Sequence, residues 1–525
     1  MTFQPNFLLF ITDQQRADHL GAYGNRTVRT PQLDALAARG WLAERCYVAS
    51  PVCMPNRASL LTGRWPSVHG VRHNGIPLSL RTRTFLDSLR GAGYRTALVG
   101  KGHLQNMTGK AALFPEPGKV RLPEALCAPT GRYDQEWGPA WSASEQHDVT
   151  RPYYGFDDVV LAIDHGDTAG GHYRRWLESE HPQVAAVAGQ RFAIPAPGYA
   201  LAEAGQAWRT RVPENCHPTA YIADQTMRML DTHAGGKQPF FLQCSFPDPH
   251  HPFTPPGRYW DKYAPEDMTL PESFNVAGRE LPPHLAWLHR MRDEGKAVKH
   301  TPALFACTER EAREAIALNY GSISFIDDMI GRVLAHLQAR GLADSTIVIF
   351  TSDHGDFMGE HQLLWKGPLH YQSLTRVPFM WSDPQAPAMA GRHSKLCSTA
   401  DIAPTILTRA GVPLFNGIQG TSMLPLMEGE TAWRDAVVIE EEAQRLLFGF
   451  ASRPRVRTLQ TERFRMSLYD GQPWGELYDL AEDPHETRNV WFDAAYARQR
   501  SDGMEQLTRA MLALSETSPY PSAIA

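Results

Sequence analysis

Residues 51–64, PVCMPNRASLLTGR, place a cysteine and an arginine where they could do chemistry. Pro55 suits the first turn of a helix, which puts Cys53 at or just before the helix N-terminus. Arg57 follows four residues after Cys53, so it lies on the same side of that helix. An anion at position 53 would feel both the helix dipole and Arg57, and such surroundings lower the pKa of a thiol. Cys53 could therefore be a thiolate nucleophile, a metal ligand, one cysteine of a disulfide bond or a buried residue of the turn.

Polar residues follow each of four apolar segments that we predict to be strands. Ligands of open α/β sheets bind beyond the carboxyl ends of the strands, so these residues are candidates for one shared site. They are, in chain order, Asp13 and Gln14, Lys101 and His103, Asp248, His250 and His251, and Asp353 and His354. One such strand end is weak evidence because loops are polar anyway, but four of them favour a site.

Asp13, Asp353 and His354 are the candidate ligands for a divalent cation. Oxygen ligands suit calcium, magnesium or manganese, and the imidazole favours manganese over calcium. An isolated Asp after a strand more often caps the helix or loop that follows. For the whole set we favour a metal site.

Five basic side chains are candidates for binding an anion: Arg57, Lys101, His103, His250 and Lys366. In a chain of net charge -5, their convergence would make a local trap for an anionic head group. Taken singly, each lysine is better explained as a solvated loop residue and each histidine as a hydrogen-bonded buried group.

Alternating strands and helices must position these residues. Buried apolar strands between helices predict an α/β fold, with a large, mixed but mostly parallel sheet flanked by helices. The predicted strands are Asn6–Thr12, Tyr94–Val99, Pro239–Cys244 and Thr346–Phe350. The predicted helices are Gln32–Gly40, Pro55–Thr62, Arg83–Ala92, Ala220–Leu230 and Glu309–Arg340, the last with a break near Gly321.

Two parts of the chain differ in pattern. Residues 1–430 are predicted to form the large α/β domain, with insertions of weak periodicity at about 105–215, over one face of the sheet, and at about 255–305. Residues 431–525 are predicted to form a small antiparallel sheet with one helix. Its expected elements are strands at Ala436–Glu440, Phe464–Tyr469 and Gly475–Leu480 and a helix over 493–515.

The composition narrows the class of protein. The chain has 525 residues, 42% hydrophobic and 21% charged, as in an ordinary globular protein. A net charge of -5 argues against nucleic acid or an anionic membrane as a partner. The N-terminus lacks a signal-peptide pattern, no segment approaches the length of a membrane span, and the seven scattered cysteines include no CxxC. We therefore expect a reduced, cytoplasmic protein with neither a disulfide framework nor a structural zinc site.

The segment CMPNR at 53–57, followed by LTGR at 61–64, resembles the signature of the type I sulfatases of the alkaline phosphatase superfamily. Further stretches resemble motifs of that family from about residue 5 to residue 492. They are ITDQ at 11–14, GKGHL at 100–104, PHHPF at 249–253, TSDHGD at 351–356 with Lys366 after it, and LYDL at 477–480 with Asp483, Pro484 and Glu486. The cysteine motif is highly specific, and the others support it by order and spacing.

The resemblance implies an alkaline-phosphatase-like fold and hydrolysis of small-molecule sulfate esters. In this family a separate formylglycine-generating enzyme oxidises the signature cysteine, here Cys53, to formylglycine. One divalent metal ion, Mn²⁺ or Ca²⁺, would be bound by a set that comprises Asp13, Gln14, Cys53, Asp353 and His354. One hydroxyl of the hydrated formylglycine would attack sulfur, and the other would then expel sulfate by regenerating the aldehyde. A serine ester would instead need a second attack at sulfur.

The resemblance also implies roles for the basic residues. Arg57, Lys101 and Lys366 would stabilise charge on the sulfuryl oxygens. His103 would take a proton from the geminal diol, and His250 or Lys366 would protonate the leaving alcohol.

Two positions depart from the common sulfatase pattern. Gln14 stands where many members have a second Asp, and His354 where Asn is frequent. These two residues, together with Asn74, resemble the phosphonate monoester hydrolases, which use the same nucleophile; Asn74 and Gln14 are thus candidate substrate contacts. Lys101 and His103 follow the sulfatase pattern, so sulfatase ranks first. A promiscuous phosphonate monoester or phosphodiester hydrolase is the alternative.

A third hypothesis is an anion-binding protein without turnover, in which Cys53 stays unmodified. A binding site needs no C-x-P-x-R signal, so the motif argues against it. The natural substrate, the identity of the metal and the formation of a homo-oligomer stay open at this stage.

Overall fold

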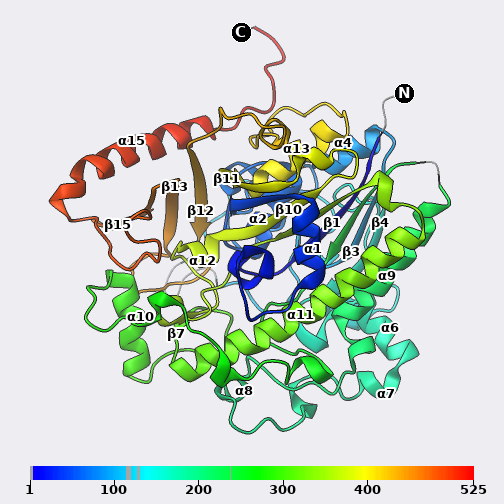
Figure 1. Cartoon of the computed structure of the whole chain (residues 1–525), viewed down its shortest axis with the longest axis horizontal. Coiled ribbons are helices and arrows are strands. Elements are labelled where there is room, and N and C mark those ends of the chain that lie inside the picture. Colours follow the sequence, from blue (N-terminus) through cyan, green and yellow to red (C-terminus); the bar gives the residue numbers. More distant parts are fainter. Residues whose placement is uncertain (1–3, 114–119, 127–129, 237, 525) are drawn as a thin grey trace.

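The computed structural model describes residues 4–113, 120–126, 130–236 and 238–524. Its centre is a nine-stranded sheet in the order β11-β2-β10-β8-β1-β6-β3-β4-β5 (Figure 1). The bounds are β1 Asn6–Thr12, β2 Trp41–Tyr47, β3 Arg95–Gly100, β4 Asp158–Ile163, β5 Gly170–Gly171, β6 Phe240–Ser245, β8 Thr346–Ser352, β10 Arg376–Ser382 and β11 Gly391–Ser398. A separate two-stranded pair joins β7 (Phe305–Ala306) to β9 (Leu363–Leu364).

The middle of the sheet is parallel. Strands β8, β1, β6, β3 and β4 run in one direction. Strand β10 is antiparallel to both of its neighbours, β8 and β2, and β5 is antiparallel to β4. The predicted class, a mixed but mostly parallel sheet, is confirmed. Strands β2, β10 and β11 were not among the predicted elements.

Helices bury both faces of this sheet. Along β1, Leu8 and Phe10 belong to one hydrophobic core, while Phe7 and Leu9 belong to the other. This alternation explains why the strand is apolar at every position from Phe7 to Ile11. The first core is covered by α1 (Pro31–Arg39), α9 (Pro218–Ala234) and α11 (Glu309–Ala339), and the second by α2 (Cys53–Thr62), α4 (Phe85–Gly91) and α13 (Ile402–Arg409) (Figure 1).

The remaining helices are shorter or peripheral. They are α3 (Pro66–His69), α5 (Gly138–Ala143), α6 (His172–Glu180), α7 (Pro182–Ala185), α8 (Ala200–Glu203), α10 (Pro283–Asp293), α12 (Gln372–Thr375), α14 (Leu424–Met427) and α15 (Ala497–Ala513).

Helix α11 has no break, so the break predicted near Gly321 is wrong. The helix runs without interruption through that glycine. The glycine has a packing reason, since a Cβ at position 321 would lie 2.3 Å from the carbonyl oxygen of Tyr259. Gly321 therefore allows close approach of a neighbouring backbone and does not interrupt the helix.

Residues 105–215 are not simply an insertion over one face. This segment contains β4 and β5, which extend the central sheet beyond β3. Between Gly100 and Asp158 the chain forms only the short helix α5 among its described residues. The weak periodicity around β4 concealed the strand, although its apolar sequence DVVLAI fits a buried position.

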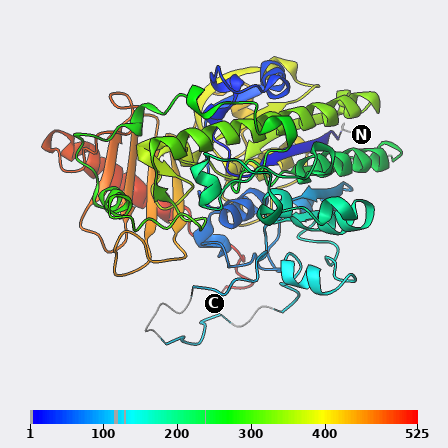
Figure 2. The same cartoon turned by 90° about the horizontal axis from the view of Figure 1, so that it is seen from below.

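The C-terminal part forms an antiparallel sheet with a helix, as predicted, but the second of its four strands was not among the expected elements. Strands β12 (Ala436–Glu442), β13 (Arg455–Thr461), β14 (Phe464–Tyr469) and β15 (Gly475–Asp479) pair in chain order, and α15 lies beside them (Figures 1 and 2). This unit contacts the chain near Cys53, because the backbone N–H of Glu440 donates to the carbonyl of Ala49 at 2.9 Å.

The six cysteines among the described residues are free and buried, and Cys127 lies outside the described residues. Across the described ranges, no helix combines the length and the apolar character needed to cross a bilayer.

Candidate active site

The carboxyl ends of the parallel strands bring the predicted polar residues together. The backbone N–H of Asp353 donates to the carbonyl of Thr12 at 3.1 Å, which joins the end of β8 to the end of β1. Lys101 is joined in the same way to Ser245, at 2.9 Å, beside the end of β6. Hydrogen bonding of the sheet thus continues one residue beyond the strands and sets the first side chains of the loops against each other.

Cys53 is the first residue of α2, as the position of Pro55 predicted. Val52 before it is extended, and all ten residues of the helix are buried. The side chain of Asn56 fixes this end of the helix, since its Nδ2 donates to the carbonyl of Asp353 at 2.6 Å. The helix therefore presents residue 53 to the loop after β8.

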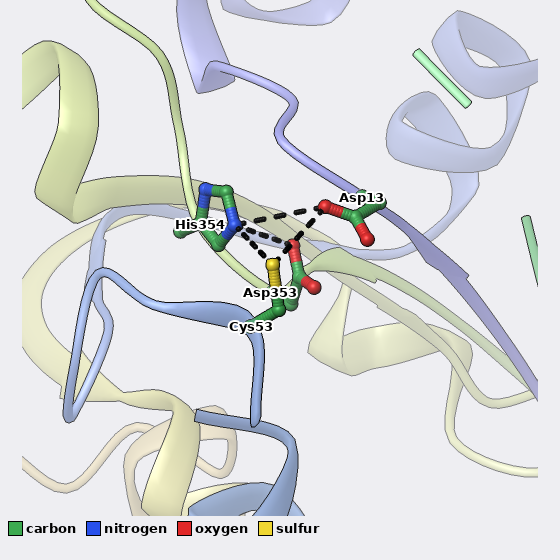
Figure 3. A group of neighbouring side chains, drawn as sticks. All are labelled: Asp13, Cys53, Asp353 and His354. Atoms are coloured by element: carbon green, nitrogen blue, oxygen red, sulfur yellow. Dashed lines mark hydrogen bonds and ion pairs between the residues drawn. The ribbon is translucent and has the colours of Figure 1, made fainter. Parts of the chain in front are cut away.

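Asp13, Cys53, Asp353 and His354 form a buried group of potential metal ligands (Figure 3). One donor atom of each lies within 4.8 Å of the others. The His354 Nε2 atom is 3.1 Å from the Cys53 sulfur and 3.6 Å from a carboxylate oxygen of Asp13 and of Asp353.

The donor set fits a divalent cation. His354 Nδ1 lies 2.8 Å from the carbonyl oxygen of Gly355, to which it must donate its hydrogen. That bond leaves the Nε2 lone pair directed at the group, which is the usual arrangement of a metal-binding histidine. Two carboxylates supply the hard oxygen ligands that Mn²⁺ and Ca²⁺ prefer.

Gln14 turns its carboxamide oxygen toward the same group. Its Nε2 donates to the carboxylate of Asp356, which directs Oε1 the other way, where it accepts from Lys366 Nζ at 3.1 Å. Its backbone has φ 64°, and its N–H donates to Asp353 Oδ1 at 3.1 Å. The unusual backbone conformation is thus held by a bond to a predicted metal ligand.

Lys366 reaches the centre of the site from the loop after β9. Its Nζ lies 3.0 Å from both the Cys53 sulfur and His354 Nε2, and 3.1 Å from His250 Nε2. Burial lowers the pKa of Lys366, but the negative charges of Cys53, Asp13 and Asp353 outweigh it and raise the pKa above its ordinary value. Lys366 is therefore an ammonium in this site.

The electrostatics favour anions at positions 13 and 53. Burial raises the pKa of Asp13, but nearby positive charge, that of Lys101 most of all and also that of Arg57, outweighs burial and holds it well below its usual range. Burial and Asp13 raise the pKa of the Cys53 thiol, whereas Lys366, His354 and Lys101 lower it, with a net value of about 7. The sequence argument for an acidic thiol at position 53 agrees with this geometry.

Arg57 contacts the carboxylates rather than facing an open pocket. Its Nε donates to Asp353 at 2.8 Å, and its Nη2 lies 3.6 Å from Asp13. Its Nη1 donates to Ser245 Oγ at 2.9 Å and to the carbonyl of Lys101 at 3.1 Å. Arg57 thereby joins four strand ends, those of β8, β1, β6 and β3.

Lys101 and His103 lie on the side of the site formed by β3. Lys101 is fully buried and its Nζ contacts the carboxylate of Asp13. Burial, together with Lys101 and Arg57, holds the pKa of His103 well below its ordinary value, so its imidazole is neutral in this site. Its Nδ1 is buried without a hydrogen-bond partner among the described residues.

Asn74 supports the start of α2. Its Oδ1 accepts a hydrogen bond from the backbone N–H of Met54 at 3.0 Å. Gln444, from the loop after β12, donates in turn to the carbonyl of Asn74. The candidate substrate contact therefore has a structural partner next to Cys53.

Aromatic and imidazole rings form a stacked column beside the site. His165 lies on His250 with ring centres 3.8 Å apart, His250 on His251 at 4.2 Å, and His251 on Trp365 at 3.9 Å. The sequence analysis did not single out His165. A signal was available, because His165 lies two residues after the end of β4, but β4 itself was not predicted.

Comparison with known proteins shows which family has this sequence and fold. Residues 5–412 match the family model described as Sulfatase. Residues 359–513 also match a model for the C-terminal part of N-sulphoglucosamine sulphohydrolase.

Relatives and solved structures extend over nearly the whole chain. An arylsulfatase of Clostridium perfringens is 28% identical over 520 residues, which cover 96% of this chain and 93% of that protein. A multifunctional alkaline phosphatase superfamily protein of Trinickia caryophylli is also 28% identical, over 94% of this chain and 92% of that protein. The crystal structure of the phosphonate monoester hydrolase of Agrobacterium radiobacter matches with a TM-score of 0.77 and 27% identity, covering 98% of this chain and 97% of that one.

Proposed function

The chain belongs to the sulfatase family and is a sulfuric ester hydrolase, and from this premise we propose that it cleaves sulfate monoesters with a formylglycine made from Cys53. One observation carries the proposal. The cysteine of the C-x-P-x-R motif begins a buried helix and lies in one group with Asp13, Asp353 and His354. Packing alone does not explain a buried thiol beside two carboxylates. A catalytic role does, because a nucleophile needs to lie beside the metal that activates it.

Asp13, Gln14, Asp353, His354 and residue 53 would hold one Mn²⁺ or Ca²⁺ ion. Such an ion supplies positive charge to the sulfuryl oxygens and to the attacking hydroxyl. Arg57 keeps Asp13 and Asp353 in place and balances their charge, in addition to the role in anion binding that its motif implies.

Formylglycine, when hydrated, supplies two hydroxyl groups, one to attack sulfur and one to release sulfate. We assign to the neutral imidazole of His103 the proton that the diol loses. Lys101 and Lys366 place positive charge beside the sulfuryl group. Overall, a sulfate monoester and water yield an alcohol or phenol and hydrogen sulfate, and the aldehyde is regenerated.

Lys366 and His250 are the candidates to protonate the leaving oxygen. His250 Nδ1 contacts the carbonyl of His251 and so carries its hydrogen there, which leaves Nε2 as an acceptor for Lys366. The available proton therefore resides on Lys366 in the resting site, and it reaches the leaving group either directly or through His250.

The test combines mass spectrometry with a substitution. The peptide that contains residue 53, from protein made with its maturation enzyme, should have the mass of formylglycine, and Cys53→Ala should lose hydrolysis of an activated aryl sulfate. Treatment with a chelator should abolish activity, and Mn²⁺ or Ca²⁺ should restore it. Full activity with an unmodified cysteine would refute the proposed nucleophile.

A phosphonate monoester or phosphodiester hydrolase, with the same nucleophile, is the second candidate. Gln14, His354 and Asn74 favour it, as does the similarity to the phosphonate monoester hydrolase of Agrobacterium radiobacter. Lys101 and His103 favour the sulfatase. The ratio of kcat/KM for an aryl sulfate and the matched aryl phosphonate monoester decides between them, and a clear preference for the phosphonate would reverse our ranking.

Maturation of Cys53 requires a formylglycine-generating enzyme as a partner. We place the protein in the cytoplasm, which the free state of its six described cysteines supports.

A further inference from the structure

We propose that His165 is a positioning residue that orients both Lys101 and His250 for the reaction. The proposal rests on the proposed function, because it concerns the two groups that would handle charge and protons in sulfate ester cleavage. Its evidence is the contacts of the His165 ring, which touches both of these residues and the carboxylate of Asp13.

The end of β4 delivers His165 to the site. Strand β4 pairs in parallel with β3, from Ala97 opposite Asp158 to Gly100 opposite Leu161. Lys101 follows β3 directly, and His165 comes from the turn after β4, where Asp164 has φ 71°; its Nε2 reaches Lys101 Nζ at 2.7 Å. The His165 side chain is 12% exposed, whereas that of Lys101 is fully buried. His165 thus covers Lys101 on the outer side of the site.

The hydrogen bonds of His165 have a defined direction. Its Nε2 lies 2.7 Å from Lys101 Nζ, and an ammonium group can only donate, so Nε2 must accept. Its Nδ1 lies 2.9 Å from a carboxylate oxygen of Asp164, to which it donates. The neighbouring Asp164 thus selects the tautomer that can hold Lys101, as a carboxylate does for a metal-binding histidine.

The second contact of His165 is with His250. The two rings are stacked with centres 3.8 Å apart and planes inclined by 16°. His251 stacks on the opposite face of His250, so the His250 ring is held between two others. His250 Nε2 then points to Lys366, 3.1 Å away. Removal of the His165 ring would free one face of His250 and loosen its bond to Lys366.

An alternative use of the same atoms is a second cation site. Asp13, His165 and His250 have donor atoms close enough to share an ion. However, Lys101 Nζ contacts the same Asp13 carboxylate and the same His165 nitrogen. Its positive charge and its hydrogens already use those acceptors, so a second cation there would be repelled. His165 Nε2 therefore binds the ammonium group of Lys101 and not a metal ion.

The experiment compares His165→Ala, His165→Gln and His336→Gln in the mature holoenzyme. His336 is a matched control, because it also pairs with a carboxylate, Asp231 at 2.6 Å, but on the outer surface of α11. Each variant is assayed with a series of aryl sulfates whose phenols differ in pKa. Loss of His165 should lower kcat by about 10- to 100-fold, the usual effect of removing a group that orients a catalytic ligand.

The dependence on the leaving group separates positioning from simple packing. If His165 orients His250 and the proton of Lys366, the loss in His165→Ala should grow as the phenol becomes less acidic, because poor leaving groups need protonation most. KM should change less than kcat. His165→Gln keeps an acceptor for Lys101 but not the stacked ring, so it should restore part of kcat while the steeper leaving-group dependence remains.

The outcomes distinguish this proposal from the proposed function. Equal kcat and equal leaving-group dependence in His165→Ala and the wild type would overturn the positioning role and leave the formylglycine mechanism untouched. A uniform loss that tracks reduced thermal stability or reduced metal content would also overturn it. Retained activity in Cys53→Ala would instead refute the proposed function.

Discussion

The guanidinium of Arg57 donates through Nε to the carboxylate of Asp353 at 2.8 Å, and both side chains are buried. The C-x-P-x-R motif therefore brings more than a nucleophile to the site, since its arginine also holds a carboxylate that belongs to the candidate metal group. A second contact, from Nη2 to Asp13 at 3.6 Å, joins the arginine to the other carboxylate of that group.

Arg57→Lys should weaken metal binding. A lysine cannot bridge two carboxylates with a planar fork, so Asp353 and Asp13 would lose their common partner. We expect the metal concentration for half-maximal activity to rise by about 10- to 100-fold. Titration of the apoprotein with Mn²⁺ and Ca²⁺ measures this. Arg95→Lys, which alters an exposed pair with Asp158, is the control. Unchanged metal affinity would contradict the bridging role.

Cys53→Ser should stall after one turnover. A serine that has taken the sulfuryl group has no second hydroxyl to expel it, so the sulfated enzyme should accumulate. Intact-mass measurement after mixing with an aryl sulfate should show addition of one sulfuryl group, with a burst of one phenol per enzyme. Cys53→Ala should show neither signal. Steady turnover by protein that is verified to contain serine at position 53 would refute the geminal-diol mechanism.

Asn74→Asp should separate the structural role of Asn74 from substrate binding. Aspartate keeps an acceptor for the N–H of Met54, so thermal stability should stay close to that of the wild type, whereas Asn74→Ala should lose about 1 kcal/mol. If the side chain also meets the anionic substrate, the added charge should raise KM about tenfold, equivalent to about 1.4 kcal/mol. Unchanged KM in Asn74→Asp would leave only the structural role.

Gly321→Ala should destabilise the protein although alanine favours helices. The added Cβ would lie 2.3 Å from the Tyr259 carbonyl, and moving that backbone should cost about 1–3 kcal/mol. Gly331→Ala in the same helix is the control, because its Cβ would meet the flexible side chain of Gln32 at 2.8 Å. We expect the control to stay within about 1 kcal/mol of the wild type. Calorimetric unfolding of both variants measures the difference, and equal effects would contradict the packing role.

Asp327 should make stability fall between about pH 4 and pH 7. Burial, despite two hydrogen bonds from the backbone of α1, raises its pKa from 3.8 to about 7. In this range the folded state binds more protons than the unfolded state, so the free energy of unfolding decreases as pH rises, by up to about 4 kcal/mol.

Asp327→Asn should remove this part of the pH dependence, because an amide does not titrate. The variant would also lose one hydrogen bond from the backbone, which would lower its free energy of unfolding by the same amount at every pH. Denaturant unfolding at pH 5, 6, 7 and 8 measures the difference between the variant and the wild type, which should grow in favour of the variant as pH rises. Parallel curves would show that Asp327 does not titrate in this range.

The fold class and the centre of the site could be predicted because the relevant signals are local in sequence. A strand that is buried on both faces has a continuous apolar stretch, as β1 has from Phe7 to Ile11 and β8 from Ile347 to Phe350, and charged residues come only after the strand. Parallel strands place these first residues at one edge, so Asp13, Lys101 and Asp353 could be grouped without a structure. The start of α2 was signalled in the same way by Pro55.

Other features depend on partners that are distant in the chain, and only the tertiary structure decided them. Gly321 signalled a helix break by its type, but the backbone of Tyr259 determines its role. Arg57 has the chemistry to bind an anion, but its position between Asp353 and Asp13 makes it a bridge. His165 carries no local motif, and the turn after β4 brings it next to Lys101 and His250. The sequence by itself thus determined which chemical groups are present and at which strand ends. The long-range packing of the sheet decided which of those groups touch, because contacts between residues far apart in the chain leave no periodic pattern in it.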